Sequence, residues 1–465
     1  MGFYFFPRGG SAHAARAIAD ELDRNGLDLT VLAGSRSDLG DDASAESFFA
    51  REQLITADFS RALAATDPPA FRAPDAVPMH GSYEDRPGAK DRVFAALDDA
   101  TFETHVNAWE RELDRAGAVT CDLLYLHHLT PINEAAARSF PDVPVIGHVH
   151  GSELLMLERI AGGAPAGWLH ADAWAERMCD WAARCSRIVV NSPNGLERAI
   201  ALLDLDPARF ALIPNGFAPA FRPQAIDRKA HWRRHLVSEP RGWRPDEGPG
   251  SVRYGEADLA GLDGTVLLYS GRFTEVKRMT LLIEAFAAAR ARFSAPGSLV
   301  LLGGYPGEWE GEHPIETIER LAVPDVYLAG WHGHDELPGF LAASDVMVHA
   351  SVREQFGLVL VEAMACGVPA IAVDRGGPSM IIEDGETGWL IPPDDREAMA
   401  DAMVEAVNYR RRTAICGRKG RKAVLERYTW ERIGRDLAEL AREVIGERAG
   451  RHAAQLDFDP ALSRR

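Results

Sequence analysis

The chain has 465 residues, more than one hydrophobic core usually supports, so we expect two domains with insertions. Its apolar fraction of 46% and charged fraction of 26% are typical of a globular protein in water, and its net charge of −18 argues against nucleic acid or an anionic membrane surface as the main partner. The longest apolar run, residues 356–373, contains Glu362, Gly367 and Pro369, so we expect no membrane insertion.

The five cysteines point to a reducing compartment. They are odd in number and widely spaced, and they include no C-x-x-C pair. We therefore expect neither a disulfide framework nor a zinc knuckle. The apolar residues 3–6 are too few for a signal peptide and meet Pro7 at once, which favours a cytoplasmic protein.

The first residues predict the opening of a parallel α/β sheet. Residues 3–6 form a short strand, Gly9-Gly10 precedes an alanine-rich helix that ends near residue 25, and residues 27–35 form a second strand. The glycine pair alone is a weak signal, because a simple tight turn would use it as well. Residues 36–92 are polar and rich in proline, and we expect them to be an elaborated region rather than a separate domain; a helix should follow at about residues 92–116.

Histidines follow two predicted strands. One strand ends at His127 and His128; the other, residues 145–149, leads into the loop of His150 and Glu153. Ligands of open α/β sheets bind at the carboxyl ends of strands, so these residues are candidates for a binding cleft, although a structural role is about as common. Because H-E-x-x-H is absent and no second ligand stands at helical zinc spacing, we predict no metal site.

The second half begins after an irregular segment, residues 216–264, which we expect to join the halves. At residue 265 the β-α pattern restarts, and Arg272 and Lys277 occupy the loop after the first strand. Two cations there would neutralise a diphosphate, and arginine can bind it bidentately. The alternative is a pair of ordinary surface charges. Trp331 and His332, after a later strand, would line a base pocket or simply pack.

Residues 351–373 are the most informative stretch. Glu354 and Glu362 flank the dipeptide Phe356-Gly357, where a helix is expected to begin. Glycine lets a ligand approach the backbone, and the first N–H groups of a helix suit a phosphate. Glu354 would then face a sugar hydroxyl and Glu362 a ribose. The alternative is a buried β-α unit with two chance acids, although acids are rare in such apolar runs.

Two common nucleotide-binding motifs are absent. The sequence contains no G-x-G-x-x-G, which weakens the case for a nicotinamide dehydrogenase. It contains no G-x-x-x-x-G-K-[ST] either, which excludes a P-loop NTPase.

The chain resembles the family-4 glycosyltransferases, which are retaining enzymes of the GT-B fold. The resemblance is spread over most of the chain but weak in residues 36–118 and 224–262, and it is carried by PRGGS, HVHGSE, IPNGFAPAFRP, YSGRFTEVKR, EQFGLVLVE, GVPAIAVDRGGPSMII and DGETGWLIPPDD. It implies an α/β protein with two Rossmann-like domains facing each other across a cleft. The implied parts are an acceptor-side domain (residues 1–215), a linker (216–264), a nucleotide-sugar-binding domain (265–428), a helix crossing back to the first domain (429–448) and a tail (449–465).

The resemblance also implies a reaction: retaining transfer of a sugar from a nucleotide-linked donor, UDP-sugar before GDP-sugar, to a small-molecule or glycan acceptor. No cofactor or metal would be required, because the cationic loop supplies the charge. Alternatives are a catalytically silent nucleotide-sugar-binding protein and another GT-B enzyme, such as a sugar phosphorylase. The oligomeric state stays open.

The resemblance assigns roles to single residues. His150, Arg272, Lys277 and Glu354 would be catalytic, and His127, His128 and Glu153 would lie on the acceptor side. The donor would be bound by Gly9, Gly10, Arg272, Lys277, Trp331, His332, Glu354, Phe356, Gly357, Leu358, Val359 and Glu362.

Overall fold

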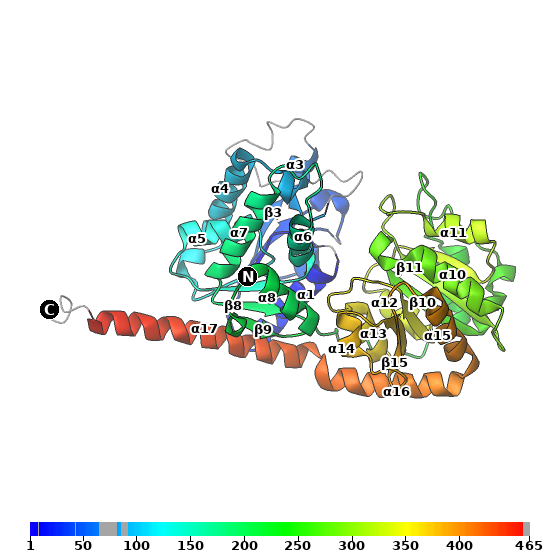
Figure 1. Ribbon diagram of the computed structural model, residues 1–465. Helices are drawn as coiled ribbons and strands as arrows, with labels where there is room; N and C mark the ends of the chain where they lie inside the picture. The colour runs from blue at the N-terminus through cyan, green and yellow to red at the C-terminus, as the bar shows by residue number, and fades with distance from the viewer. Residues whose placement is uncertain (8, 42, 65–80, 85–91, 459–465) are drawn as a thin grey trace. The chain divides into compact units, whose positions relative to one another are not determined.

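The computed structural model describes residues 1–7, 9–41, 43–64, 81–84 and 92–458, and for residues 449–458 only the backbone. The chain forms two compact units, which are Met1–Asn215 with Trp430–Arg465, and Gly216–Thr429 (Figure 1). Arg8 of the predicted first loop, the whole proline-rich segment at residues 66–78, and the end of the predicted tail lie outside the described residues.

A seven-stranded parallel sheet forms the centre of the first unit. Its spatial order is β3-β2-β1-β6-β7-β8-β9, so the order reverses between β1 and β6. The strands are β1 (Gly2–Phe3), β2 (Val31–Ser35), β3 (Leu54–Asp58), β6 (Leu124–His127), β7 (Val145–Val149), β8 (Arg187–Val190) and β9 (Phe210–Leu212). A separate two-stranded ladder joins β4 (Gly81–Ser82) to β5 (Arg92–Val93).

Helices cover both faces of this sheet because its side chains alternate between two cores. In β6, Leu124 and Leu126 belong to one core, while Tyr125 belongs to the other. The first core is closed by α4 (Asp99–Arg115), α5 (Pro131–Ser139), α6 (Ser152–Ala161), α7 (Ala171–Arg184) and α8 (Pro193–Leu203). The second core is closed by α1 (Gly10–Arg24), α2 (Ala45–Phe49) and α17 (Trp430–Phe458); α3 (Ser60–Ala64) follows β3.

The second unit repeats this plan with six parallel strands in the order β12-β11-β10-β13-β14-β15. The reversal lies between β10 and β13, which are paired directly. The strands are β10 (Thr265–Gly271), β11 (Gly297–Gly303), β12 (Val326–Gly330), β13 (Val346–His349), β14 (Ala370–Val373) and β15 (Gly388–Ile391). Both units are therefore Rossmann-like, which confirms the predicted α/β class.

Two cores also flank the second sheet. Leu267 and Tyr269 of β10 belong to the core that includes α10 (Met279–Arg290), α11 (Pro314–Leu321) and α15 (Arg396–Asn408). Val266 and Leu268 belong to the opposite core. The helices of that side are α9 (Arg228–Arg233), α12 (Leu337–Ala342), α13 (Leu358–Ala365), α14 (Gly377–Ile381) and α16 (Arg410–Arg427).

Several expectations about the first unit are wrong. The predicted strand at residues 3–6 pairs over Gly2–Phe3 alone, because Tyr4 and Phe6 leave the ladder and fill the core. Residues 36–118 are not merely an insertion, since they supply the edge strand β3 and helix α4. β3 was missed because its sequence, LITAD, is a weakly alternating edge strand with mostly half-buried side chains.

The predicted end of the last helix is also wrong. Helix α17 continues past residue 448 to Phe458, because alanine is the most frequent residue there and no proline occurs before Pro460. In Figure 1 this helix runs along the first unit, and it packs on α1.

One segment of the second unit differs from expectation as well. Residues 216–264 belong to this unit and help to form its core through Trp232 and Trp243, which are buried. They form α9, a π-helical turn (Arg234–Ser238) and a 3-10 helix (Glu256–Asp263). The last strand of the sheet, β15, pairs with β14 in parallel, because α14 carries the chain across before it returns.

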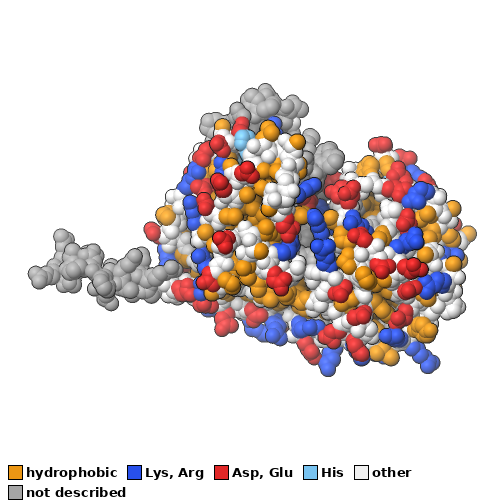
Figure 2. All heavy atoms as spheres, viewed as in Figure 1, with side chains coloured by type: hydrophobic (Ala, Val, Ile, Leu, Met, Phe, Trp, Pro, Cys, Tyr) orange, Lys and Arg blue, Asp and Glu red, His pale blue; other side chains and the backbone are white. Residues whose placement is uncertain are grey.

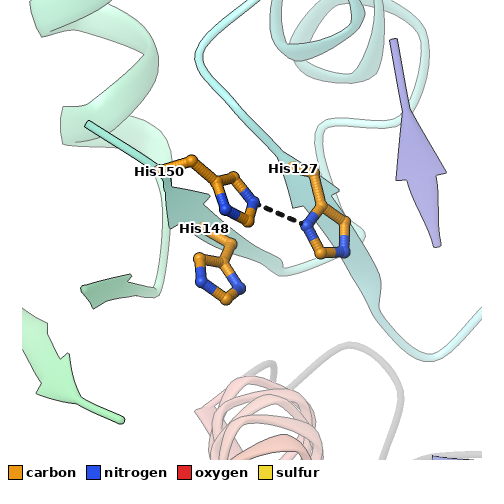
Figure 3. A group of neighbouring side chains, drawn as sticks. All are labelled: His127, His148 and His150. Atoms are coloured by element: carbon orange, nitrogen blue, oxygen red, sulfur yellow. Dashed lines mark hydrogen bonds between the residues drawn. The ribbon is translucent and has the colours of Figure 1, made fainter. Parts of the chain in front are cut away.

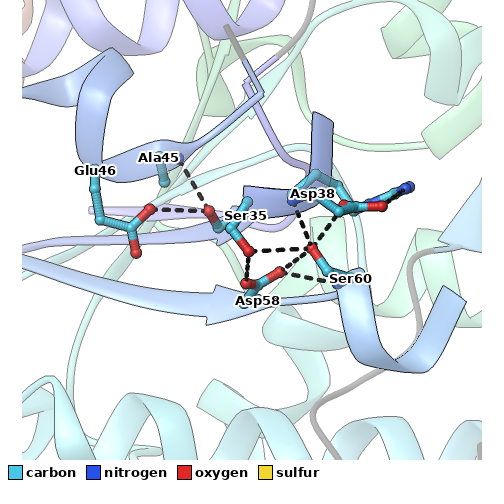
Figure 4. A network of polar contacts seen from close by, with 8 residues as sticks. Ser35, Asp38, Ala45, Glu46, Asp58 and Ser60 are labelled. Carbon is cyan, nitrogen blue, oxygen red and sulfur yellow. Dashed lines mark hydrogen bonds and ion pairs between the residues drawn. The ribbon is translucent and has the colours of Figure 1, made fainter. Parts of the chain in front are cut away.

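A polar network ties down the carboxyl ends of β2 and β3 (Figure 4). The amide of Ala45 donates to Ser35 Oγ at 3.0 Å, and that hydroxyl donates to Glu46 at 3.0 Å. Ser60 Oγ donates to Asp58 at 2.6 Å and to Asp38 at 2.7 Å. Every polar atom in these contacts has its partner nearby, so we interpret the network as support for the two strand ends.

The surface carries many charged side chains. On the face shown in Figure 2, acidic and basic side chains are interspersed. Among the described helices, none combines the length and the apolar content that crossing a membrane would need.

Candidate active site

Histidines meet at the carboxyl ends of two neighbouring strands of the first unit. His127 is the last residue of β6, and it is in register with His148 of β7; His150 follows β7 directly. The Nδ1 atom of His127 lies 2.9 Å from Nε2 of His150 (Figure 3). His148 and His150 are two residues apart and share one face of the chain, with ring centroids 4.2 Å apart.

Glu153 holds this corner of the sheet together. It is fully buried at the start of α6, where its carboxylate accepts from the amides of His150, at 3.4 Å, and Gly151, at 2.9 Å. The same carboxylate accepts from His128 Nδ1 at 2.5 Å. His128 has a left-handed backbone with φ of 67°, a conformation that non-glycine residues adopt rarely and that is found preferentially at functional sites.

Burial keeps the clustered imidazoles neutral. It lowers the pKa of His148 to about 3, and the nearby His128 adds to that effect. Burial, followed by repulsion from neighbouring histidines, also holds the pKa of His127 and His150 well below the ordinary value. His127, His128 and Glu153 are buried, whereas His150 keeps partial exposure. Of the histidines predicted here, His150 is thus the one placed to meet a substrate.

The predicted glycine pair lies at the start of the first helix. Gly9 precedes α1 with φ of 80°, Gly10 is its first residue, and both are exposed. A Cβ atom placed on either glycine would have no described atom within 4 Å. A ligand can therefore approach the backbone there.

An ion pair lies at the strand reversal of the second unit. Lys277 ends a 3-10 turn (Glu275–Lys277) that follows β10, and its Nζ lies 2.6 Å from Glu354 Oε2 in the loop after β13. His349, the last residue of β13, donates from Nε2 to the same oxygen at 2.9 Å and is almost fully buried. Ligands of open α/β sheets bind at this kind of reversal.

The charges around Glu354 keep it ionised. Burial alone would raise the pKa of its carboxyl, but Lys277 and His349 outweigh burial and hold the pKa well below the usual value. Burial lowers the pKa of His349, with a further lowering from Lys277 that Glu354 opposes. The group is therefore an ionised carboxylate between an ammonium and an imidazole N–H.

Helix α13 begins where the sequence predicted. Phe356 is buried, Gly357 is the N-cap residue with φ of 96°, and Leu358 and Val359 form the first turn. The first N–H groups of a helix have no carbonyl one turn earlier, so they face outward from its end. Glu362, on the second turn, is buried and accepts from His334 Nε2 at 2.6 Å.

A second loop supports this helix start. The amide of Gly377 donates to the carbonyl of Glu354 at 2.9 Å. A Cβ atom at Gly377 would lie 1.9 Å from the carbonyl oxygen of Phe356, so only glycine allows the two loops to approach this closely.

The remaining predicted donor residues differ in orientation. Arg272 is exposed just after β10. Trp331 is half-buried and contacts the Tyr305 ring edge-on. The side chain of His332 is buried and hydrogen-bonded to Glu336 at 3.1 Å, so it points away from any open base pocket. At this position the backbone is the part that could contact a ligand.

Sequence reasoning grouped most of these residues correctly but missed two histidines. Within the second unit, the structure brings Lys277 and Glu354 into contact. His349 and His334, which contact the two predicted glutamates, were not considered. The signal for His349 was its position at the end of an apolar strand, the same signal that identified His127.

Two known protein families match the sequence of this chain. A family described as "Glycosyltransferase Family 4" matches residues 8–221, and one described as "Glycosyl transferases group 1" matches residues 257–423. Together the two matches span most of the chain. The chain belongs to glycosyltransferase family 4. The predicted family is thereby confirmed.

Curated relatives of this family-4 glycosyltransferase are distant. It is 33% identical over 181 residues to N-acetyl-alpha-D-glucosaminyl L-malate synthase of Bacillus anthracis, covering 39% of this chain and 46% of that one. It is 28% identical over 272 residues to D-inositol 3-phosphate glycosyltransferase of Salinispora tropica, covering 57% and 52%. Each match spans about half of the relative. A longer match, 25% identical over 417 residues, is to the enzyme of that name in Mycobacterium bovis, covering 86% and 77%.

Solved structures confirm the predicted GT-B fold. Anabaena HepE in complex with UDP and glucose aligns with a TM-score of 0.64 at 18% identity, covering 94% of this chain and 98% of that one. Sucrose-phosphate synthase of Thermosynechococcus elongatus aligns with a TM-score of 0.65 at 20% identity, covering 96% and 99%.

Proposed function

We propose that the protein transfers a sugar from a nucleoside-diphosphate donor to a hydroxyl of a small-molecule or glycan acceptor, with retention of the anomeric configuration. The observation that carries this proposal is the contact of Lys277 and His349 with the ionised Glu354 at the strand reversal of the second unit. This contact brings together a cation that can bind phosphate and a carboxylate that can bind sugar hydroxyls, both close in sequence or space to the start of a helix.

The donor is bound by the second unit. Lys277 and Arg272 neutralise the diphosphate, and the first amides of α13 donate to its oxygens. Glu354 accepts hydrogen bonds from the sugar hydroxyls, and Glu362 accepts one from the ribose. Because Glu362 Oε1 already accepts from His334, the second carboxylate oxygen of Glu362 is the one that would bind the ribose. UDP is the first donor nucleotide to test, because HepE was solved with UDP, and GDP is the second.

In the proposed reaction, residues of the first unit have roles as well. The bond between the anomeric carbon and the diphosphate oxygen breaks, and cations and amides aimed at the leaving group stabilise the charge that it gains. The acceptor hydroxyl attacks from the same face and gives its proton to the departing phosphate, so no protein nucleophile is needed. His150, a neutral imidazole with partial exposure, donates a hydrogen bond to the sugar or accepts one from it. His127, His128 and Glu153 hold His150 in position. Gly9 and Gly10 admit the phosphates to the first loop.

The relatives' names suggest the first acceptors. L-malate and D-inositol 3-phosphate, which appear in those names, are both small anions with hydroxyl groups. We also propose that the enzyme works in the cytoplasm, because all five cysteines are free thiols, as is usual in a reducing compartment.

The test is a panel of UDP- and GDP-sugars with the purified protein. The correct donor should raise the apparent melting temperature, because ligand binding stabilises the folded state by mass action. Donor consumption with each acceptor is then followed by nucleotide release, and the product's anomeric configuration is read by NMR. A protein that binds no nucleotide sugar contradicts the proposal. Binding without turnover across the panel would indicate a silent binding protein, and phosphate-dependent release of sugar phosphate would indicate a phosphorylase.

A further inference from the structure

The histidines of the first unit are arranged as three converging nitrogen ligands. His148 and His150 project from one face of β7 and its extension, because side chains two residues apart in a strand share a face. His127 projects toward them from the neighbouring strand β6 (Figure 3). One ring nitrogen from each of the three histidines lies within 4.8 Å of the others.

The surroundings of two of these rings fix which nitrogen is free to bind. Nδ1 of His148 is hydrogen-bonded to the hydroxyl of Tyr125 at 2.8 Å, and its buried Nε2 has no partner among the described residues. Nε2 of His127 lies 3.2 Å from the sulfur of Met1, a weak acceptor that suits an N–H at Nε2. With those hydrogens in place, His148 Nε2 and His127 Nδ1 both carry lone pairs. His150 Nε2 then donates to His127 Nδ1, so His150 binds a metal through Nε2 only after its hydrogen moves to Nδ1 of the same ring. Metal-binding histidines are typically oriented in this way by partners of the other nitrogen.

The distances suit a tetrahedral transition-metal ion. Two nitrogens bound to zinc at its usual bond length lie about 3.3 Å apart, and His127 Nδ1 and His150 Nε2 are 2.9 Å apart. The rings of His148 and His150 lie nearly parallel, at 8°, so bringing both nitrogens to one ion requires a rotation about χ2, a soft torsion in histidine. The partly exposed His150 leaves a way in for the ion and a fourth position for water.

We propose that His127, His148 and His150 bind one zinc ion or a similar divalent transition-metal ion. Three imidazoles suit zinc, copper and nickel, whereas magnesium and calcium prefer oxygen ligands. The expectation of no metal site considered helical spacing only, and this arrangement uses strand spacing instead.

Occupation of this site would inhibit sugar transfer, a consequence that rests on the proposed role of His150. The metal ion and the sugar would compete for the same imidazole. Zinc is therefore a reversible inhibitor in this proposal, and the transfer reaction itself requires none. Direct metal binding is independent of transfer, so the two proposals can fail separately.

The experiment measures zinc binding to the chelator-treated, reduced full-length protein by calorimetry. We expect one site per chain. His148→Asn keeps an amide where Nδ1 contacts Tyr125 and removes Nε2, while His127→Gln removes Nδ1; each should weaken binding at least about 100-fold. The matched control is His235→Asn, because His235, His332 and Glu336 form the second group with ligand spacing found among the described residues. That group is less suited to metal, since Glu336 is already paired with Arg241 at 2.9 Å.

Spectra of the wild type keep the test decisive if a variant fails to fold. Copper bound to the site should show coupling to three imidazole nitrogens in electron paramagnetic resonance, and cobalt should show tetrahedral absorption without a thiolate charge-transfer band.

Zinc should slow the wild-type transferase, a chelator should restore its rate, and the rate of His148→Asn should be insensitive to zinc. No stoichiometric binding, a thiolate band, unchanged binding in folded His148→Asn and His127→Gln, or loss of binding in His235→Asn would each overturn the proposal. A transferase that zinc binds without slowing would overturn the inhibition alone.

Discussion

Lys277 acts on two partners in the proposed mechanism. Its ammonium contacts the carboxylate of Glu354 and would also neutralise the donor diphosphate. Both groups have small exposed fractions, 16% and 19% of their side chains, so water screens the pair less than it would on the open surface. Removing one partner leaves the other charge poorly compensated.

We expect Lys277→Ala to lower kcat/KM by more than tenfold, or about 1.4 kcal/mol of transition-state stabilisation. Steady-state kinetics with the identified donor measure this. The matched control is Lys419→Ala, which breaks a lysine–glutamate pair with Glu386 that is half exposed on the same unit. The control should stay within about twofold of the wild type, because exposed pairs contribute little. Wild-type kinetics in a folded Lys277→Ala protein would remove Lys277 from the mechanism.

His349 is a positioning residue in this scheme, since it reaches the sugar only through Glu354. We expect His349→Ala to raise the donor KM about fivefold, which corresponds to about 1 kcal/mol for a lost hydrogen bond to a charged group. His349→Gln, which places an amide N–H near the position of Nε2, should restore most of the loss. Equal defects in the two variants would indicate that the imidazole only fills space.

At this scale the sequence predicted which residues lie at the candidate site better than it predicted their contacts. Glu354 and Lys277 were paired in function from their positions after strands, although 77 residues separate them. His349 was missed because nothing in one sequence distinguishes a buried histidine that orients a carboxylate from one that merely packs. The buried direction of the His332 side chain was equally invisible, because it depends on Glu336 and on tertiary packing.

The loop before α13 depends on the glycine-rich loop before α14. Gly377→Ala would place a methyl group against the carbonyl of Phe356 and push the Glu354 loop away. We expect a loss of about 1–3 kcal/mol in stability and a donor KM raised more than fivefold. Thermal unfolding and kinetics measure both.

Gly446→Ala is the matched control for that change. Gly446 lies inside α17, and a Cβ atom there meets no described atom within 4 Å. Alanine should be neutral or stabilising by up to about 1 kcal/mol, because glycine weakens a helix interior. If Gly377→Ala behaved like Gly446→Ala, the close packing of the two loops would be irrelevant to the site.

Elements with strong local signals were predicted well, and elements defined by partners were not. Helix α13 follows from a Phe-Gly break and an apolar run, both visible in the sequence. The edge strand β3 is defined by its ladder with β2, and the parallel direction of β15 by the crossover through α14. Those features are long-range, so composition and periodicity carry little information about them.

Both ends of the chain build the first unit. Leu437 of α17 is 1% exposed and belongs to the same core as Ile18 of α1. We expect Leu437→Ala to lower stability by about 2–5 kcal/mol and to speed hydrogen exchange in α1, more than 400 residues earlier in the chain. The control Leu425→Ala removes a leucine that is 40% exposed on α16 and should cost far less. Faster exchange confined to the second unit would contradict this assignment of α17.

The stability of the second unit should depend on acid through Glu354. Its pKa is held below the unfolded value of about 4.5, so the unfolded chain binds more protons there as the pH falls. The contribution of Glu354 is thus fully present above that value and is lost as the pH falls through the folded pKa. The groups that face it are Lys277 and His349, and the pKa of His349 is lowered by burial.

Glu354→Gln isolates this contribution. The difference in unfolding free energy between wild type and variant should be flat from pH 7 to about pH 5.5. Below about pH 5 it should fall by up to about 1.4 kcal/mol per pH unit, the limit set by one proton.

Because two units need not unfold together, hydrogen exchange of the α13 amides is the proper readout. Glu386→Gln, in the exposed pair with Lys419, should show a weaker dependence because solvent screens it. A difference that grows on acidification would mean that Glu354 binds its proton more tightly in the folded state, which is incompatible with an ionised sugar-binding carboxylate.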